Sequence, residues 1–402
     1  MVSLEEALES LLGRTAPLDT EEVDLAETHG RVPAGDICAP VDLPAFDRSA
    51  MDGYAVRSSD TAGAREEAQV RLALRGELPA GAILQPGEAV RVATGGPLPR
   101  GVDAVLVVEA AREDAEAVWA RAAVRPGDNV IRRGSDVSRG TLALERGTQL
   151  DAAALGLLAG LGVTRIRVFR RPRVHLLVTG DEVVAPHEEP GPGQIRDQNS
   201  LGIGWACREA GAEVVGCARV GDDPDRLREA LTAGRGAEVI LVSGGVSVGR
   251  RDFLRRVVAE MGGEELFWRV HMRPGKSALG ALVDGRPLVG LAGSPGSAML
   301  TFQLLVRPLL RHLGGHRYLA RPRVPVRLAE GFPKASPRPR YLRATVGEGA
   351  AGPMAHLISG QGSDSTFSWL RANALVVVPG GSGPLAAGES LEAIMLDRPE
   401  EH

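Results

Sequence analysis

Residues 238–249 read EVILVSGGVSVG, and this stretch decides the fold class. The four apolar residues at 239–242 run without interruption into a loop that carries three glycines. A short apolar run bounded by glycines is typical of a buried strand. Because a helical pattern follows around Asp252, the stretch predicts a strand, a loop and a helix in succession.

The same alternation continues on both sides of this stretch. Helical segments carry start signals, such as Asp223 followed by Pro224. The alternating segments are VHLLV (174–178), NSLGIGWACREAG (199–211), AEVVGCARV (212–220), DPDRLREALTAG (223–234) and PLVGLAGSPGS (287–297). This order predicts a doubly wound, mostly parallel sheet with helices on both faces over residues 173–320. In such a sheet, ligands bind beyond the carboxyl ends of the strands.

Three further regions surround the predicted sheet, so the chain is expected to be multidomain α/β plus β. Strand-like runs between turn signals such as QPGEA predict a strand-rich inserted domain at 45–148. The helical patterns in residues 1–44 and 149–172 predict a helical stalk in which the two helices pack together. Strand-like runs without helical patterns predict a small all-β domain at 321–402.

Length and charge bound the class of protein. A chain of 402 residues is expected to form two to four domains, since a domain averages about 150 residues. A net charge of −4 argues against a nucleic-acid or membrane-surface binder. The start MVSLEEALESLLGR reads as a helix with a capping box of Ser3 and Glu6, not as a signal peptide.

The cysteines and the hydropathy indicate the compartment. Cys38, Cys207 and Cys217 show no CxxC spacing, which fits a reducing environment without structural zinc. No apolar run reaches the roughly 18 residues that a membrane span needs. We therefore expect a cytoplasmic location.

Two glycine-rich turns are candidate anion sites. The first, Ser243–Gly249, follows a strand and precedes a helix, so its backbone N–H groups can approach an anion. The second, Gly290–Ser297, also leads directly into a helix. A plain tight turn is the alternative for each. Two such turns in one sheet suggest a ligand that lies across both.

Carboxylates follow three of the predicted strands and suggest a cation site. They are Asp181 with Glu182, Asp222 with Asp223, and Asp252. Oxygen ligands beside phosphates suit Mg²⁺. Asp223 has the alternative role of a helix N-cap, and Asp252 can simply favour a helix N-terminus.

Two other segments stand out. Arg269, Arg273 and Lys276 provide cations that suit an oxyanion or phosphate, with solvated surface charge as an equal alternative. Residues 42–56, DLPAFDRSAMDGYAV, mix charged, small and aromatic residues without helix or strand period. Dense polar loops of this kind often belong to functional sites.

These motifs resemble those of the MoeA family of molybdopterin molybdenumtransferases, which is related to the gephyrin E domain. The resemblance extends over the whole chain, and the first and sixth motifs are the most specific. The motifs are FDRSAMDGYAV (46–56), RVATGGPLP (91–99), GSDVSRG (134–140), VTGDEVV (178–184), GQIRDQNS (193–200), VSGGVSVGRRDF (242–253), MRPGKS (272–277) and GLAGSPGSA (290–298).

The resemblance implies a reaction and an assembly. The substrates would be adenylylated molybdopterin and molybdate. Cleavage of the phosphoanhydride would release AMP and leave molybdenum on the dithiolene. The resemblance also implies a homodimer of elongated four-domain subunits, and possible contacts with other proteins of molybdenum cofactor synthesis.

The resemblance also implies roles for particular residues. The catalytic positions would be Asp52, Thr94, Asp136, Glu182 and Lys276. Mg²⁺ would be held by Asp222, Asp252 and Glu182, with Asp222 preferred over Asp223. The substrate-binding positions would be Asn199, Ser243, Gly244, Gly245, Ser247, Arg269, Arg273, Gly293, Ser294 and Pro295.

The chain departs from the family pattern in two motifs. The usual turn GLPGNP reads GLAGSP here, so Ala292 and Ser294 replace a proline and an asparagine. The usual PGKP reads PGKS, which places Ser277 where a proline is common. The backbone cradle remains possible with these residues, whereas the side-chain contacts must differ.

Three other functions are alternatives to this one. A tungstate-inserting paralogue would use the same motifs. A non-catalytic, gephyrin-like scaffold would favour an appended domain and a long linker, and its acidic positions would not need to be intact. A regulator that binds anions or nucleotides is the third alternative.

Overall fold

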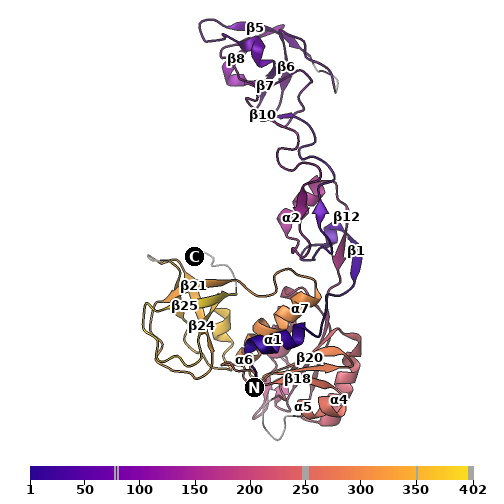
Figure 1. Ribbon diagram of the computed structural model, residues 1–402, viewed down its shortest axis with the longest axis vertical. Coiled ribbons are helices and arrows are strands. Elements are labelled where there is room, and N and C mark those ends of the chain that lie inside the picture. The colour runs from indigo at the N-terminus through magenta and orange to yellow at the C-terminus, as the bar shows by residue number, and fades with distance from the viewer. Residues whose placement is uncertain (77, 79–80, 247–252, 350–351, 397–402) are drawn as a thin grey trace.

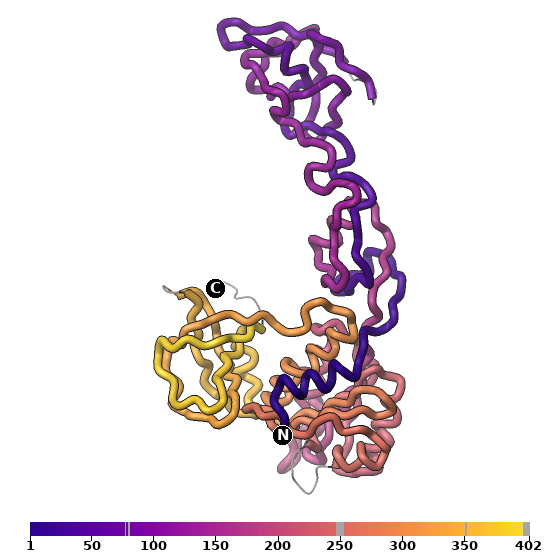
Figure 2. Tube along the Cα trace, in the orientation of Figure 1, coloured from indigo at the N-terminus to yellow at the C-terminus, as the bar shows by residue number. Residues whose placement is uncertain are grey.

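The chain forms an elongated molecule with a distal domain at one end of a narrow stalk. In the computed structural model, residues 1–76, 78, 81–246, 253–349 and 352–396 are described. Figure 1 shows the distal domain far from the α/β domain, with the C-terminal β domain beside the latter. The tube in Figure 2 shows the chain running out along the stalk and returning beside itself.

The α/β domain is built on a six-stranded sheet in the order β16-β13-β17-β20-β19-β18. The first four strands are parallel, and β19 and β18 continue the sheet in antiparallel pairing. The predicted mostly parallel sheet is therefore confirmed. Its strands are β13 (Arg173–Thr179), β16 (Glu213–Val220), β17 (Val239–Ser243), β18 (Glu264–Trp268), β19 (Leu279–Val283) and β20 (Arg286–Leu291), with a small pair β14 (Val183–Val184) and β15 (Ile195–Arg196) at one edge loop.

Helices cover both faces because successive strand residues point to opposite sides. Leu241 packs with α1, α3, α6 and α7, whereas its neighbours Ile240 and Val242 pack with α4 and α5. The helices are α1 (Leu4–Leu12), α3 (Asn199–Glu209), α4 (Pro224–Ala233), α5 (Leu254–Glu260), α6 (Pro295–Thr301) and α7 (Arg307–Leu313), with a π-helical stretch η5 (Phe302–Val306) between the last two and a 3-10 turn η4 (Gly234–Gly236).

The expectation that the two flanking helices pack together is wrong. Leu4, Ala7 and Leu11 of α1 are buried in the α/β core, where α1 contacts α7 and β18. Both ends of α1 are tied there, because Val2 bridges to Val270 and Arg14 pairs with Glu264. The large apolar face of the α/β domain buries more of this amphipathic helix than a thin stalk can.

The stalk itself is mainly a β-ribbon with one helix, which corrects the predicted helical stalk. Strand β1 pairs in antiparallel fashion with β12, whose residues lie more than 100 positions later in the chain. Local periodicity cannot reveal such a pairing. The stalk elements are β1 (Thr20–Asp24), η1 (Leu25–Glu27), β2 (Ile37–Cys38), β11 (Leu142–Leu144), α2 (Ala152–Gly160) and β12 (Arg165–Phe169).

The distal domain contains a second six-stranded sheet, in the order β7-β4-β6-β5-β9-β8. Buried Tyr54, Leu72, Leu106 and Val118 form its core. Its elements are β3 (Arg48–Ser49), β4 (Gly53–Val56), η2 (Ser58–Thr61), β5 (Val70–Arg75), β6 (Glu88–Val92), β7 (Ala104–Val107), η3 (Val108–Ala110), β8 (Ala111–Glu113), β9 (Ala117–Ala120) and β10 (Val130–Ile131), with β3 paired to β10.

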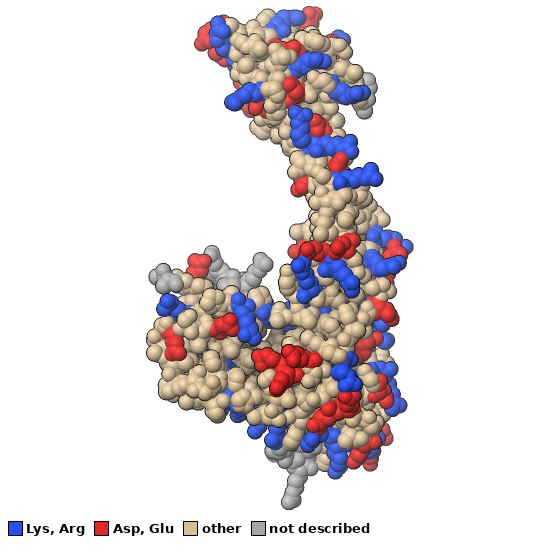
Figure 3. All heavy atoms as spheres, viewed as in Figure 1, with Lys and Arg blue, Asp and Glu red and all other residues tan. Residues whose placement is uncertain are grey.

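The C-terminal domain is a small closed β-barrel in the order β21-β23-β22-β24-β25, which confirms the predicted all-β domain. Its elements are β21 (Arg323–Leu328), β22 (Arg340–Gly347), β23 (Met354–Leu357), α8 (Phe367–Leu370), β24 (Ala374–Val378) and β25 (Ser390–Met395). Acidic and basic side chains are interspersed over the face of the molecule seen in Figure 3.

No helix in the described part of the chain is long and apolar enough to cross a membrane.

Candidate active site

Two glycine-rich turns leave the sheet side by side. Neighbouring parallel strands end at Ser243 and Leu291, so their turns meet at one edge. The Gly244 N–H donates to the Leu291 carbonyl at 2.9 Å. The Asn199 amide donates to the Ser243 hydroxyl and to the Gly293 carbonyl, each at 2.8 Å. Asn199 therefore ties the two turns together.

This tie uses the polar groups of two predicted substrate-binding residues. Asn199 and Ser243 are both buried. The Ser243 hydroxyl accepts from Asn199 and donates to the Ala292 carbonyl at 3.4 Å. Since buried polar groups need such partners, the Asn199 NH2 group and the Ser243 hydroxyl hold the two turns in place, and their predicted contacts with substrate stay predictions.

Different structural constraints act on the two glycines of the first turn. Gly244 and Gly245 both have positive φ, at 101° and 66°. A Cβ on Gly244 would lie 2.5 Å from Thr179 Oγ1, whereas a Cβ on Gly245 would lie 3.3 Å from the same atom. Close packing against β13 therefore requires glycine at 244. Gly245 is half-buried, and it lines the cavity described next.

A cavity of about 360 Å³ opens at this edge of the sheet, and we call it the carboxylate chamber. Glu182 and Asp222 line it, and none of its described lining residues is Lys or Arg. Its other lining residues are Thr179, Gly180, Gly244, Gly245, Val246, Ser277, Ala292, Gly293 and Ser294. The predicted Ser247 and Asp252 lie outside the described residues.

The structure distinguishes Asp222 from Asp223. Asp222 lines the carboxylate chamber, and its N–H donates to Asp181 Oδ1 at 2.9 Å. Asp223 instead caps α4, because its Oδ1 accepts from the N–H groups of Asp225 and Arg226 at 2.8 and 3.1 Å. These backbone hydrogen bonds lower the pKa of Asp223. Asp222 is thus the residue of this pair that lines the chamber.

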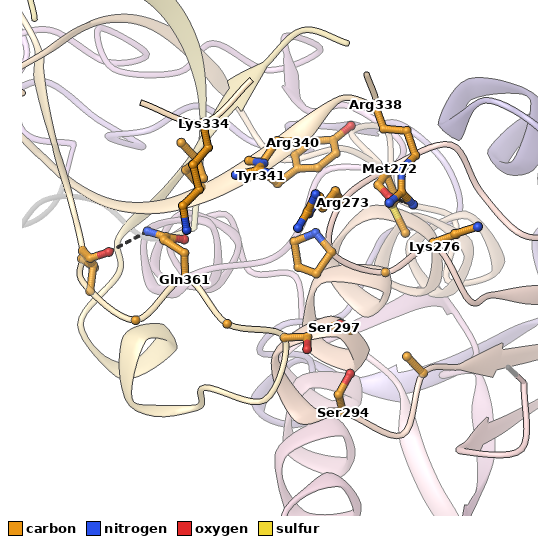
Figure 4. A pocket seen from close by; sticks show the side chains of 18 of the residues that line it. Met272, Arg273, Lys276, Ser294, Ser297, Lys334, Arg338, Arg340, Tyr341 and Gln361 are labelled. Carbon is orange, nitrogen blue, oxygen red and sulfur yellow. Dashed lines mark hydrogen bonds between the residues drawn. The ribbon is translucent and has the colours of Figure 1, made fainter. Parts of the chain in front are cut away.

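A larger cavity of about 660 Å³ adjoins the first and lies between the α/β domain and the barrel, and we call it the cationic chamber. Five basic residues and no acidic residue are found among its described lining residues. Figure 4 shows the basic side chains gathered around it, with Lys276 and Lys334 toward its two sides. The basic residues are Arg273, Lys276, Lys334, Arg338 and Arg340.

A backbone bridge joins the two domains at this chamber. Arg273 pairs with Arg340 in a parallel β-bridge. The Arg273 N–H donates to the Pro339 carbonyl at 2.9 Å, and the Tyr341 N–H donates to the Arg273 carbonyl at 3.0 Å. The bridge places basic residues from both domains around one space.

The cationic chamber perturbs one of its own arginines. Arg340 is 7% exposed, and its Nε has no hydrogen-bond partner among the described residues. Burial, together with the neighbouring charges of Arg273 and Arg338, lowers the pKa of Arg340. An anion in the chamber would offset this concentrated positive charge and could accept a hydrogen bond from the buried Arg340 Nε.

A loop from the barrel, residues 359–363, closes another side of the chamber. Arg343 is buried beneath it and donates to the carbonyls of Gly360 and Gly362 at 3.3 and 2.9 Å. The Ser297 N–H donates to the Ser363 carbonyl at 3.0 Å, which docks the loop on α6. Hydrogen bonds within the protein therefore fix this wall.

Sequence reasoning missed the residues that the barrel contributes. They are Lys334, Arg338, Arg340 and the 359–363 loop. A basic run, KASPRPRYLR at 334–343, and the glycine-rich ISGQGS at 358–363 were the available signals. Neither indicated which face of the barrel would meet the α/β domain.

The remaining predicted substrate-binding residues differ in whether they line a chamber. Arg269 lines neither chamber, and its guanidinium stacks over the Trp268 ring at 4.2 Å. Pro295 occupies the first turn of α6, while Gly293 and Ser294 line the carboxylate chamber. Arg269 has this contact within the protein, and its predicted contact with substrate stays a prediction.

Asp52 and Thr94 lie together next to β4 and β6 of the distal domain, which Figure 1 shows far from the α/β domain and its chambers. Asp52 lines a separate cavity of about 700 Å³ there. Asp136 lies on an exposed loop near the stalk, where its N–H donates to the Leu43 carbonyl at 3.1 Å. One chain therefore brings Glu182, Lys276 and the turns together, but not the first three predicted catalytic residues.

Comparison with known sequences matches nearly the whole chain to described families. Residues 2–162 match the MoeA N-terminal region (domain I and II). Residues 175–312 match a probable molybdopterin binding domain. Residues 325–396 match the MoeA C-terminal region (domain IV).

Relatives and solved structures agree with these matches. A Mycobacterium tuberculosis protein named molybdopterin molybdenumtransferase 2 is 36% identical, with 92% of this chain and 93% of that protein covered. The molybdopterin molybdenumtransferase of Bacillus subtilis is 32% identical over 94% of this chain and 90% of that protein. Two solved structures of a molybdopterin biosynthesis MoeA protein from Pyrococcus horikoshii are similar to this chain over their whole length. The first has a TM-score of 0.80 at 32% identity, and the match covers 99% of this chain and 100% of that chain. The second has a TM-score of 0.82 at 29% identity, and the match covers 98% of this chain and 100% of that chain.

Proposed function

The chain belongs to the MoeA family, as a transferase of molybdenum cofactor biosynthesis, and from this premise we propose which reaction its two chambers perform. It takes adenylylated molybdopterin and molybdate. Water attacks the phosphoanhydride and AMP leaves, while the two dithiolene sulfurs replace oxygen ligands of molybdate, which leave as water. The single observation that carries this proposal is the contact between a cationic chamber and a carboxylate chamber along one edge of the sheet.

The cationic chamber suits molybdate. Molybdate is a tetrahedral dianion, and five basic side chains with no acidic lining residue among those described neutralise its charge. Arg338 and Arg340 offer fork-shaped donors, whereas Lys276 and Lys334 offer point charges. Binding by this set would weaken as salt rises, because the chamber is open to solvent.

The carboxylate chamber and the two turns suit the phosphate part of the other substrate. Gly245 lines this chamber without a side chain, so that an anion can approach the turn, and Gly293 lies beside Gly244. A phosphate next to Glu182 and Asp222 requires a cation between them. None of the described lining residues of the chamber is Lys or Arg, so we propose a metal cation in this role.

Mg²⁺ fits this donor set. Glu182 and Asp222 supply hard oxygen ligands to one small chamber, and Asp252 is proposed as the third. Among the residues that the structure describes, no three Asp, Glu, His or Cys side chains form a cluster that could hold a metal. Two protein carboxylates plus substrate oxygens and water match the usual manner of binding Mg²⁺. When bound, the ion neutralises charge on the leaving phosphate.

A homodimer would complete the site. Asp52, Thr94 and Asp136 lie on the distal domain and beside the stalk, and the stalk holds that domain away from its own sheet (Figure 2). In a two-fold dimer the distal domain of one subunit would face the chambers of the other. Each site would then combine the sheet edge of one chain with Asp52 of its partner.

Tungstate insertion is the alternative function that the site also supports. Tungstate is a tetrahedral oxyanion of the same charge, so the same chamber accepts it. A gephyrin-like scaffold is disfavoured, because the acidic and basic groups needed for chemistry line one groove. We place the enzyme in the cytoplasm, where other proteins of molybdenum cofactor synthesis would supply its substrate.

The test is a reaction with defined substrates. The protein is incubated with adenylylated molybdopterin and Mg²⁺, with molybdate or tungstate, and both AMP release and metal incorporation are followed. We expect AMP release that depends on molybdate. Release at the same rate without either oxyanion would contradict the proposed function.

A further inference from the structure

Three residues line both chambers, and they form the junction between them. They are Ser277, Ala292 and Ser294. All three are small, and none is charged. The junction is therefore an uncharged aperture between a space lined by five cations and a space lined by two carboxylates.

The hydroxyl groups at this aperture are not used within the described part of the protein. Ser294 occupies the N-cap position of α6, yet its side chain makes no capping hydrogen bond. Its backbone carbonyl accepts the helical hydrogen bonds from Ser297 and Ala298 instead. Figure 4 shows Ser294 at the edge of the cationic chamber with its hydroxyl directed inward. Ser277 is half-buried and follows Lys276 directly.

The sequence points independently to the same three positions. Ser277, Ala292 and Ser294 are the residues at which this chain departs from the family motifs PGKP and GLPGNP. Two prolines and an asparagine are exchanged for one methyl group and two hydroxyls. These three positions lie where the two chambers meet.

We propose that Ser277 and Ser294 form the hydrogen-bonding position at which the tetrahedral oxyanion passes from the cationic chamber to the substrate in the carboxylate chamber. This inference rests on the proposed function. Ala292 keeps the aperture wide enough for the anion. The two hydroxyls donate to its oxygens without adding charge.

Uncharged donors suit a position that must release its ligand. An anion that lay among the arginines would be held strongly, and one beside Glu182 without a bound cation would be repelled. Hydroxyl donors at the aperture bind the anion more weakly than the arginines do. Weak binding lets the anion leave the aperture, and transfer between adjacent sites requires such release. Ser277 and Ser294 are thus positioning residues that determine which anions can pass.

The test separates binding from turnover. Ser277→Ala, Ser294→Ala and the double variant are compared with Ser10→Ala, a matched control whose hydroxyl bonds a backbone carbonyl on α1. Molybdate affinity is measured by calorimetry on each protein without the second substrate. The kcat and KM for molybdate are measured from AMP release.

We expect each single variant to lose about 10-fold in kcat, because a hydrogen bond to a charged group has been removed. Molybdate affinity should change by less than about 3-fold, since the basic residues remain. Ala292→Leu should also lower kcat with affinity retained. The control should match the wild type.

Two results would overturn the proposal. One is wild-type kcat in the double serine variant. The other is an unchanged kcat together with a loss of molybdate affinity as large as the loss of kcat/KM. That result would mean that the two serines only bind molybdate and do not act in its transfer. If the wild-type protein itself shows no molybdate-dependent AMP release, the proposed function has failed and not this inference. Unchanged thermal unfolding of each variant excludes a folding defect.

Discussion

Asp52 Oδ1 accepts two hydrogen bonds from Thr94, one from its backbone N–H at 2.7 Å and one from its hydroxyl at 2.8 Å. These bonds lower the pKa of the Asp52 carboxyl. Asp52 therefore remains ionised to a lower pH than an ordinary aspartate. Any stabilisation from its charged form is present above the usual pKa of Asp and is lost as the pH falls through the lowered value.

Thr94→Ala should raise the pKa of Asp52. The variant removes the hydroxyl donor but keeps the backbone N–H, so part of the shift should persist. The carboxyl titration is followed by NMR, with Asp52→Asn to assign the signal. The acid limb of the activity profile should move to higher pH in the same variant. An unchanged titration would mean that the hydroxyl does not stabilise the carboxylate.

The α/β domain could be predicted because its signals are local. Each strand is an apolar run of a few residues, and Asp223 with Pro224 marks the start of α4 as expected. The same is true of the capping box of Ser3 and Glu6. Sequence patterns of this range determine the element, and the alternation of elements determines the parallel sheet.

The pairings between distant segments could not be predicted in this way. Thr20 lies opposite Phe169, and Arg273 lies beside Arg340, so the stalk and the cationic chamber depend on contacts that local patterns do not encode. The sequence alone also could not show that the hydroxyl of Ser243 is used by Asn199. About half of the candidate site, its barrel side, was therefore missed.

The lysines offer a direct probe of the cationic chamber. The chain has 47 basic residues besides histidine, and only Lys276 and Lys334 among them are lysines. Both line the cationic chamber. Amine-specific methylation of the native protein should therefore modify these two side chains and the N-terminus. Molybdate should protect both lysines while the N-terminus reacts normally, as mass spectrometry of peptides would measure.

Chloride at equal ionic strength is the control for that experiment. A tetrahedral dianion that occupies the chamber shields the amines, whereas simple screening by salt would act on all three sites alike. Equal protection by chloride would remove the evidence for an oxyanion site.

Asp222 and Asp223 provide a matched pair of neighbours. Asp223→Ala should lower the unfolding temperature by a few degrees, because the α4 cap is lost, and should leave turnover near the wild-type value. The difference in unfolding temperature between Asp223→Ala and the wild type should disappear as the pH falls through the lowered pKa of Asp223. Asp222→Asn keeps the cap of α4 and should raise the Mg²⁺ concentration needed for half-maximal turnover. If Asp222→Asn lowered the unfolding temperature and Asp223→Ala raised the Mg²⁺ requirement, Asp222 would be the helix cap and Asp223 the metal ligand.

Gly244 and Gly245 should differ in the same manner. Gly244→Ala should unfold at a clearly lower temperature, since its Cβ would lie 2.5 Å from Thr179 Oγ1. Gly245→Ala should cost only about 1 kcal/mol for its left-handed backbone. Gly245→Val should fold but fail to bind adenylylated molybdopterin in calorimetry, because bulk would block the approach of the phosphate. Wild-type affinity in Gly245→Val would make the turn a purely structural element.

The central claim is that each active site combines the chambers of one chain with Asp52 of another. The most direct measurement uses Asp52→Ala and Glu182→Gln, which should each be inactive as homodimers. The two variants are co-expressed with different tags, and the mixed dimer is purified on both. One site of the mixed dimer collects both wild-type residues and the other both substitutions, so we predict about half of the wild-type turnover per dimer. A verified mixed dimer as inactive as either parent would contradict the account.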